Sequence, residues 1–366
     1  WDLGLVGLYQ FLPALLLTLV AGHVADRVHR GHIQAACLVV QTLVVALLMA
    51  ATMGLGSSGT PWVSRGLLLW ISVALGVARA FQMPAQQALV PSLLPPDLLA
   101  RGLAFSSAGG QGATIGGPAL GGLLYTLGAS VVYASCAVLF AIGCVLILGL
   151  RYVHVRRPAA PVTMQTVLAG VAFVWERKIL LGAISLDLFA VLLGGATALL
   201  PIFARDILLV GPSGLGVLRA APAVGALVMS VSLSHRPLRR KVGRSMLVAV
   251  AVFGMCMLVF GLSHSFMLSL VALAISGAAD TVSVVVRQTL VQLETPDAMR
   301  GRVSAVNSIF IGASNQLGEF ESGATAALFG PVGSVVLGGI GTLLVAALWA
   351  RWFRPLAQRD RLDRSN

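Results

Sequence analysis

Long apolar runs alternate with short charged loops along this sequence, and that alternation restricts the fold more than any other feature. The runs Leu3–Ala21 and Ile33–Leu55 carry no charge, and each is longer than the roughly 18 residues that predict a transmembrane helix. The charged loop between them extends from Gly22 to Gly31 and on to His32. Because this loop is so short, the two helices must turn back on one face of a membrane.

Eleven such runs predict an all-α, polytopic membrane protein with eleven of its transmembrane helices in this sequence. Only 10% of the residues are charged and the mean hydropathy is +0.92, whereas soluble domains carry about 25% charged residues. These values exclude a soluble protein. The predicted spans are residues 3–24, 33–55, 66–84, 103–128, 131–150, 179–204, 214–234, 245–263, 266–287, 303–329 and 334–352.

The basic residues indicate which membrane face is which. Of the 25 Lys and Arg residues, 21 fall on one face, Arg65 and Arg205 fall on the other, and Arg79 and Arg219 lie within spans. Cytoplasmic loops retain Lys and Arg, so this split predicts a cytoplasmic C-terminus in the cytoplasmic (inner) membrane. The net charge of +12 therefore reflects topology, and nucleic acid is not an expected partner.

Two stretches repeat each other and indicate a transporter built by duplication. Residues 87–102 and 288–301 share a Gln-x-Leu-Val start, a Pro-Asp pair and an Arg-Gly end, as expected for two parallel halves. Five spans precede the linker and six follow it, so we expect one more helix before Trp1.

The predicted domains are an N-terminal helical half at 1–150, a cytoplasmic linker at 151–178 with an amphipathic helix at Met164–Glu176, a C-terminal helical half at 179–354 and a basic cytoplasmic tail at 355–366.

Polar residues within the spans follow helical spacing and predict a water-filled cavity between the halves. A charge at the bilayer centre costs roughly 2.5–3.5 kcal/mol, so each such stripe must avoid lipid. The stripes run from Ser276 to Arg287, from Ser308 to Ser322 and from Ser72 to Gln82, each along one helix face. The predicted substrate-cavity residues are Arg79, Gln82, Gln111, Thr114, Ser276, Ser283 and Asn315.

Three carboxyl groups in the spans are candidates for carrying a coupling proton. Burial in a low dielectric favours the protonated carboxyl group, which is what a proton carrier needs. We predict Glu319 as the first candidate, with Asp280 and Asp187 after it; the alternative is a structural carboxylate held by amides or an arginine. Glu321, two residues further on, points elsewhere and is assigned to helix–helix contact.

Two arginines in or near the spans have alternative interpretations. Arg79 attracts an anionic substrate, tunes a carboxylate on the helix expected before Trp1, or forms a fixed ion pair between helices. Arg287 stands at the predicted end of its span, where a cation suits the helix dipole, and we expect it to cap that helix.

The motifs around these residues resemble those of the major facilitator superfamily. Gly22-x-x-Ala-Asp26-Arg27-x-x-Arg30 is similar to its loop between helices two and three, Arg79 to the arginine of its fourth helix, and Gly117–Gly122 to its GPxxGG antiporter motif. Residues 200–206, 277–280 and 314–323 are similar to the enterobactin-exporter-like branch of siderophore and drug exporters. The resemblance covers nearly the whole chain.

This resemblance implies twelve helices, with span 3–24 as the second, and proton-driven export of a small organic molecule. Uptake, lipid flipping and a non-transporting membrane sensor remain alternatives. His29, Gly31 and Ala113 depart from the family motifs. The residues that match them are the gating loop, Gly22, Asp26, Arg27 and Arg30, and the helix-kink motif, Gly117, Pro118, Gly121 and Gly122.

No sequence feature predicts an enzyme, a metal site or a cofactor. The four cysteines lie in apolar runs without a CxxC pair, and HExxH, GxSxG and Walker motifs are absent. The six histidines all lie in loops. The resemblance instead implies a small-molecule substrate and protons as partners beside membrane lipid, and we expect a monomer.

Overall fold

The computed structural model describes residues 1–55, 62–94, 96–150, 164–236, 238 and 240–360, and every regular element among them is helical. The α-helices are labelled α, and the short 3-10 and π segments are labelled η. The elements are α1 (Asp2–Arg27), α2 (Arg30–Thr52), α3 (Arg65–Leu93), α4 (Pro96–Tyr125), α5 (Ala129–Gly149), α6 (Met164–Glu176), α7 (Lys178–Leu193), η1 (Ala196–Leu199), α8 (Leu200–Ile202), η2 (Phe203–Ile207), α9 (Gly211–His235), α10 (Val242–Leu262), α11 (Phe266–Glu294), α12 (Asp297–Trp352) and α13 (Arg354–Ala357).

Length and composition make these helices suited to a bilayer. Eight helical stretches among the described residues are long and apolar enough to cross a membrane. In α5, none of the residues is buried although the mean hydropathy of its window is 2.7. Val145 and Leu139 on this helix are 69% and 67% exposed. Such a surface is stable only where lipid covers it.

The longest of these stretches, Ile309–Trp352, contains two crossings. Its 44 residues would extend about 66 Å at the α-helical rise, about twice the roughly 30 Å hydrocarbon core. Gly330 divides it, because its φ of 76° is left-handed, and Pro331 begins the return helix. The two predicted spans 303–329 and 334–352 agree with this turn.

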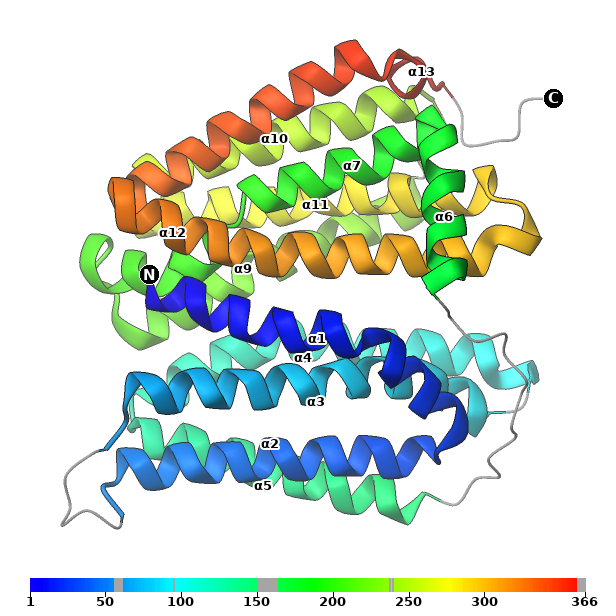
Figure 1. Cartoon of the computed structure of the whole chain (residues 1–366). Helices are drawn as coiled ribbons and strands as arrows, with labels where there is room; N and C mark the ends of the chain where they lie inside the picture. Colours follow the sequence, from blue (N-terminus) through cyan, green and yellow to red (C-terminus); the bar gives the residue numbers. More distant parts are fainter. Residues whose placement is uncertain (56–61, 95, 151–163, 237, 239, 361–366) are drawn as a thin grey trace.

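The helices form two bundles in Figure 1, one of α1–α5 and one of α6–α13. Within the first bundle, α1 packs against α3 and α2 against α5; within the second, α11 packs against α9 and α10, and α12 against α7 and α10. Backbone approaches are close: a Cβ atom on Gly225 of α9 would overlap the carbonyl oxygen of Ala274 on α11. Small residues allow such packing in lipid.

Helix α6 confirms the predicted linker helix and lies across the ends of its neighbours (Figure 1). Its Gly170 packs against the backbone of Arg302 at the start of α12. Residues 151–163 of the predicted linker and 361–366 of the tail lie outside the described residues. We call the end of the bundles where α6 lies the linker end, and the opposite end the Trp1 end.

The predicted span 179–204 falls within one candidate membrane span, Lys178–Ile207, but the helix within this span is broken, which was not predicted. Helix α7 stops at Leu193, and Gly194 and Gly195 separate it from η1, α8 and η2. The break brings the chain close to α12, where the Ser322 hydroxyl donates a hydrogen bond to the carbonyl oxygen of Gly195 at 2.9 Å. A hydroxyl from a neighbouring helix thus satisfies a backbone group that the break frees, as broken membrane helices require.

Candidate functional site

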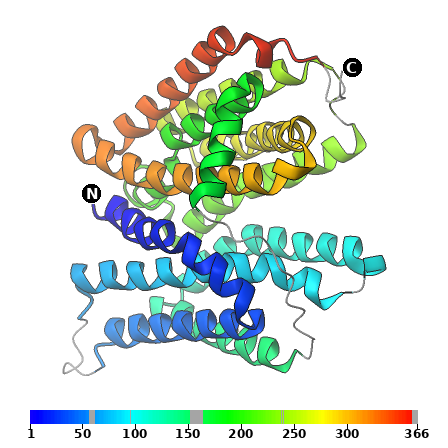
Figure 2. The same cartoon turned by 45° about the vertical axis from the view of Figure 1, so that its right-hand side comes forward.

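The two bundles meet at the Trp1 end through the first turns of α1 and the middle of α12. The rings of Trp1 and Phe320 lie 6.0 Å apart in an edge-on arrangement. A Cβ atom on Gly323 would lie 2.6 Å from the Cα atom of Gly4, so these backbones touch directly. Figures 1 and 2 show α1 and α12 side by side here and diverging towards the linker end.

A second contact joins α4 to α9 at the same end. A Cβ atom on Gly122 would lie 2.9 Å from the Cα atom of Gly216, and one on Gly216 would lie 2.5 Å from the carbonyl oxygen of Pro118. Gly122 and Pro118 belong to the predicted kink motif, which therefore lies at the junction of the bundles. Helix α4 continues through Pro118 without interruption.

Gly117 and Gly121 of the same motif do not pack closely against another described helix. A Cβ atom on Gly117 or Gly121 would meet no described atom within 4 Å. Gly121 instead borders a cavity of about 430 Å³ beside the α4–α9 contact, together with Tyr125, Arg205 and Arg219. Only Gly122 of this motif serves close approach between helices.

Glu319 lies on α12 where that helix faces the first bundle. A Cβ atom on Gly7 of α1 would lie 3.2 Å from both the Cβ and the Oε2 atom of Glu319, so the carboxylate lies directly against α1. The cations whose charges act on it are Arg79 of α3 and Arg219 of α9. Among the described residues neither forms an ion pair with it within 4.0 Å.

The two arginines whose charges act on this carboxylate belong to opposite bundles. Arg79 and Arg219 are both exposed, and Glu319 is half-buried. A negative charge between two separated positive charges, at a surface that both bundles share, can exchange partners when the bundles move.

A second polar cluster lies inside the second bundle. Arg287 forms an ion pair with Asp187 of α7, with 3.2 Å between the closest atoms, and donates a hydrogen bond to the Oδ1 atom of Asn307 on α12 at 2.9 Å. Asp187, Asp280 and Ser283 line a small enclosed cavity of about 10 Å³, close to the space that one water molecule needs. The hydroxyl of Ser283 has no hydrogen-bond partner among the described residues.

This cluster corrects three predictions. Arg287 does not cap α11, because the helix continues to Glu294 and the guanidinium is buried in its ion pair. Ser276 and Ser283 do not line a cavity between the bundles: both are buried, and Ser276 donates to the carbonyl oxygen of Leu273 on its own helix. The polar stripe of α11 faces the interior of its own bundle.

The other predicted cavity residues lie in different environments. Gln82 accepts a hydrogen bond from Gln41 of α2 at 2.7 Å, so this amide is engaged within the first bundle and not in a shared cavity. Gln111 is half-buried, whereas Thr114 and Asn315 are exposed.

The predicted gating loop lies at the linker end. Gly22, Asp26 and Arg27 lie in the last turns of α1 and Arg30 begins α2. The side chains of Asp26 and Arg27 lie outside the described residues, so their gating role stays a prediction.

Comparison with known proteins decides the family. A family model described as a transmembrane secretion effector, of the major facilitator superfamily, matches residues 3–366. The chain belongs to this family. It is therefore a multi-pass membrane transporter and not an enzyme, and the predicted resemblance to the major facilitator superfamily is confirmed.

Curated relatives add distant similarity to exporters. The enterobactin exporter EntS of Citrobacter koseri is 29% identical over 134 residues, which are 37% of this chain and 32% of that protein. EntS of Shigella flexneri is 25% identical over 185 residues, or 50% of this chain and 43% of that protein. The match therefore spans less than half the length of either exporter.

Solved structures confirm the predicted fold of this transporter. A mutant of the nucleoside transporter NupG superposes with a TM-score of 0.73 at 13% identity, covering 97% of this chain and 90% of that one. A bacterial homologue of the lysosomal transporter Spinster gives 0.70 at 15% identity, covering 100% and 92%. At these identities the likeness concerns the fold alone.

Several residues of this site were not predicted from the sequence. Arg219 was among the intramembrane charges without a role, and Gly7, Gly216 and Asn307 were not singled out. A glycine facing another glycine becomes recognisable only once two distant helices are placed together. For Arg219, the available signal was its charge within an apolar run.

Proposed function

We propose that this transporter exports a small organic molecule from the cytoplasm across the inner membrane by alternating access, with protons as the driving ion. The observation that carries the proposal is the position of Glu319 against Gly7, since this carboxylate lies on the contact between the bundles. Export requires that contact to open. A group whose charge changes there can link proton transfer to the opening.

The distribution of basic residues indicates which end of the bundles faces the cytoplasm. Of the 21 Lys and Arg residues that the sequence placed on one face, Arg287 is buried inside the second bundle. The other 20 fall on the face that we assign to the linker end, so the positive-inside rule favours a cytoplasmic linker end. In this orientation the Trp1 end is the outer end, and the Gly4–Gly323 and Gly122–Gly216 contacts close it. Consistent with separation at the inner end, residues Phe105–Gly110 of α4 are all exposed.

Proton transfer at Glu319 would alter the balance of charges between the bundles. When ionised, Glu319 is attracted by both Arg79 of the first bundle and Arg219 of the second. When protonated, it no longer offsets these two cations, so the attraction that joins the bundles weakens. Protonation of Glu319 would thereby weaken the contact that closes the outer end.

A second carboxyl pair supports proton coupling independently. Asp187 and Asp280 share the small cavity in the second bundle with Arg287 as their cation. If both carboxyl groups were ionised, the buried cluster would carry one uncompensated negative charge, which is costly in a low dielectric. A proton on one of them removes that cost, so Asp280 is the second coupling candidate.

The cargo is proposed from chemistry and from the relatives. Arg79 and Arg219 are exposed cations whose charges act on Glu319, and they favour a molecule with anionic or phenolic oxygens. The similarity to enterobactin exporters agrees with a siderophore, and an amphiphilic drug is the alternative. Uptake, lipid flipping and sensing are other outcomes of the test.

Purified protein in proteoliposomes tests this function. With enterobactin and a panel of amphiphilic dyes as probes, an acidic lumen should drive substrate accumulation in inside-out vesicles, because the lumen corresponds to the outside of the cell. Substrate-coupled alkalinisation of the acidic side would be seen with a pH dye in the same vesicles. Accumulation in the opposite orientation would indicate uptake, and absence of flux for every probe would favour a sensor.

A further inference from the structure

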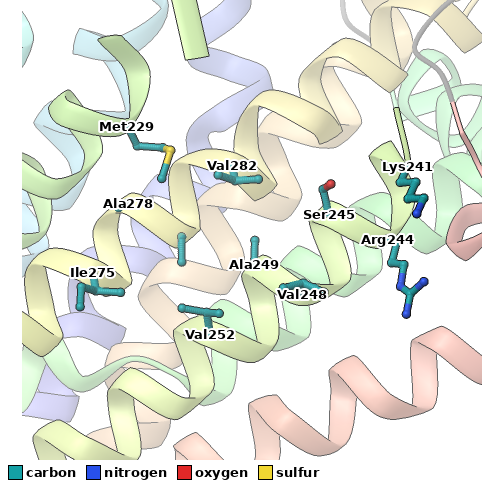
Figure 3. A pocket seen from close by; sticks show the side chains of 11 residues that line it. Met229, Lys241, Arg244, Ser245, Val248, Ala249, Val252, Ile275, Ala278 and Val282 are labelled. Carbon is teal, nitrogen blue, oxygen red and sulfur yellow. The ribbon is translucent and has the colours of Figure 1, made fainter. Parts of the chain in front are cut away.

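A groove of about 420 Å³ lies on the second bundle between α9, α10 and α11 (Figure 3). Helix α10 packs against α7, α11, α12 and α13, all of the second bundle, so the groove is separate from the junction between the bundles. The residues that line it are Met229, Lys241, Arg244, Ser245, Val248, Ala249, Val252, Ile275, Ala278, Ala279 and Val282.

Small residues create the hollow and larger apolar residues border it. Ala278 of α11 and Ala249 of α10 leave space between the two helices. Val248 and Ile275 beside them are 54% and 46% exposed, which suits a surface that meets acyl chains. Arg244, Val248 and Val252 follow at four-residue spacing on one face of α10, so the groove extends about 12 Å along that helix.

Two cations stand at one end of this apolar groove. Figure 3 shows Lys241 and Arg244 together at this end, which is the linker end because both belong to the first turn of α10 or the residue before it. Both residues are exposed. Among the described residues, neither side chain has an ion-pair partner.

The backbone at Lys241 is held in an unfavourable conformation. Its φ of 54° is left-handed, a region that costs a non-glycine residue about 1 kcal/mol or more. Asp360 of the tail fixes it by accepting a hydrogen bond from the Lys241 backbone N–H at 3.1 Å. Asp360 therefore caps the start of α10 through the backbone, and the Lys241 ammonium remains available to a ligand.

We propose that this groove binds one anionic phospholipid, with the phosphate between Lys241 and Arg244 and an acyl chain along Val248 and Val252. A basic pocket between transmembrane helices at the cytoplasmic side is the arrangement that recognises anionic head groups. The apolar floor accounts for the chain and the two cations account for the phosphate. The binding depends on membrane insertion alone and not on the direction of transport or the cargo.

Lipid binding to the purified full chain tests this inference. In detergent, native mass spectrometry should show retained dioleoyl phosphatidylglycerol in preference to dioleoyl phosphatidylcholine. The double variant Lys241→Gln with Arg244→Gln should lose about 30-fold in affinity for phosphatidylglycerol, from roughly 1 kcal/mol for each cation. Arg351→Gln is the matched control, since Arg351 is an exposed cation of α12 outside the groove.

A groove-filling variant separates a lipid site from a phosphate site. Ala278 is half-buried and borders the hollow, so Ala278→Leu should weaken phosphatidylglycerol binding while both cations remain. Soluble glycerol phosphate should compete poorly with the lipid. Equal binding of the two lipids, an equal loss in Arg351→Gln, or tight binding of glycerol phosphate unaffected by Ala278→Leu would each overturn the proposal.

Discussion

Asp187 of α7 and Arg287 of α11 form an ion pair with 3.2 Å between their closest atoms, and their side chains are only 6% and 3% exposed. This pair joins two helices inside the second bundle. It also orients the guanidinium so that another of its nitrogens donates to Asn307 of α12. Three helices are therefore held by one arginine.

Breaking this pair should destabilise the protein strongly. Asp187→Asn removes the ion-pair partner of the buried guanidinium, and removal of one partner of such a pair costs about 3–5 kcal/mol. Asp280, the other carboxyl group of the cavity, forms no ion pair with Arg287 within 4.0 Å among the described residues. Thermal unfolding in detergent should show a marked fall in Tm. Asp187→Leu combined with Arg287→Met should recover much of that loss, because no uncompensated charge remains.

A control for this prediction is the exposed pair of Asp2 and Arg65, whose side chains are 68% and 59% exposed. Exposed pairs contribute about 0–1 kcal/mol, so Asp2→Asn should leave Tm almost unchanged. An equal effect of Asp2→Asn and Asp187→Asn would contradict the structural role given to the buried pair.

Gly122→Ala should open the contact between α4 and α9. The added Cβ atom would lie 2.6 Å from the carbonyl oxygen of Pro212 and 2.9 Å from the Cα atom of Gly216, and overpacking of this kind costs ~1–3 kcal/mol. Because only the form closed at the Trp1 end has this contact, the population should shift towards the form open there. The size of that shift should be roughly 5- to 150-fold.

Spin labels at Leu127 and Leu209, which are 71% and 78% exposed, report this shift through their distance distribution. Gly121→Ala is the matched control, because its Cβ atom would meet no described atom within 4 Å. Its distances should match those of the unsubstituted protein. A shift in Gly121→Ala of the same size as in Gly122→Ala would argue against a specific helix contact.

Ser322→Ala should weaken the packing of the broken α7 segment against α12. The substitution removes the hydrogen bond from the Ser322 hydroxyl to the Gly195 carbonyl oxygen, and an unsatisfied buried acceptor costs about 1–3 kcal/mol. Tm in detergent should fall accordingly. Ser314→Ala should have a smaller effect, since the Ser314 hydroxyl donates only to Ile311 of its own helix; the reverse order would refute this account.

Helix positions were predictable because length and apolar content decide them in a membrane. Met164–Glu176 was predicted as a helix and has those bounds, and the runs around Gly22–His32 form α1 and α2. The break after Leu193 was not predicted, although Gly194 and Gly195 are its sequence signal. Its stabilising hydrogen bond comes from Ser322, which is distant in the sequence.

The site was harder to predict because spacing shows which residues share a face but not what that face meets. Asp280, Ser283 and Arg287 do share one face of α11, yet it turns towards α7 and α10. Glu319 was singled out by charge, while its contact with Gly7 depends on how two bundles dock. The groove with Lys241 and Arg244 requires three helices at once.

The central claim is that Glu319, on the contact between the bundles, couples protons to transport. Proteoliposomes with Glu319→Gln should lose acceleration of substrate flux by a pH gradient while substrate exchange without a gradient persists. Glu321→Gln is the control, since Glu321 is another half-buried carboxyl group of α12, two residues further on; it should keep the acceleration. Gradient-driven flux in Glu319→Gln equal to that of the unsubstituted protein would contradict the claim.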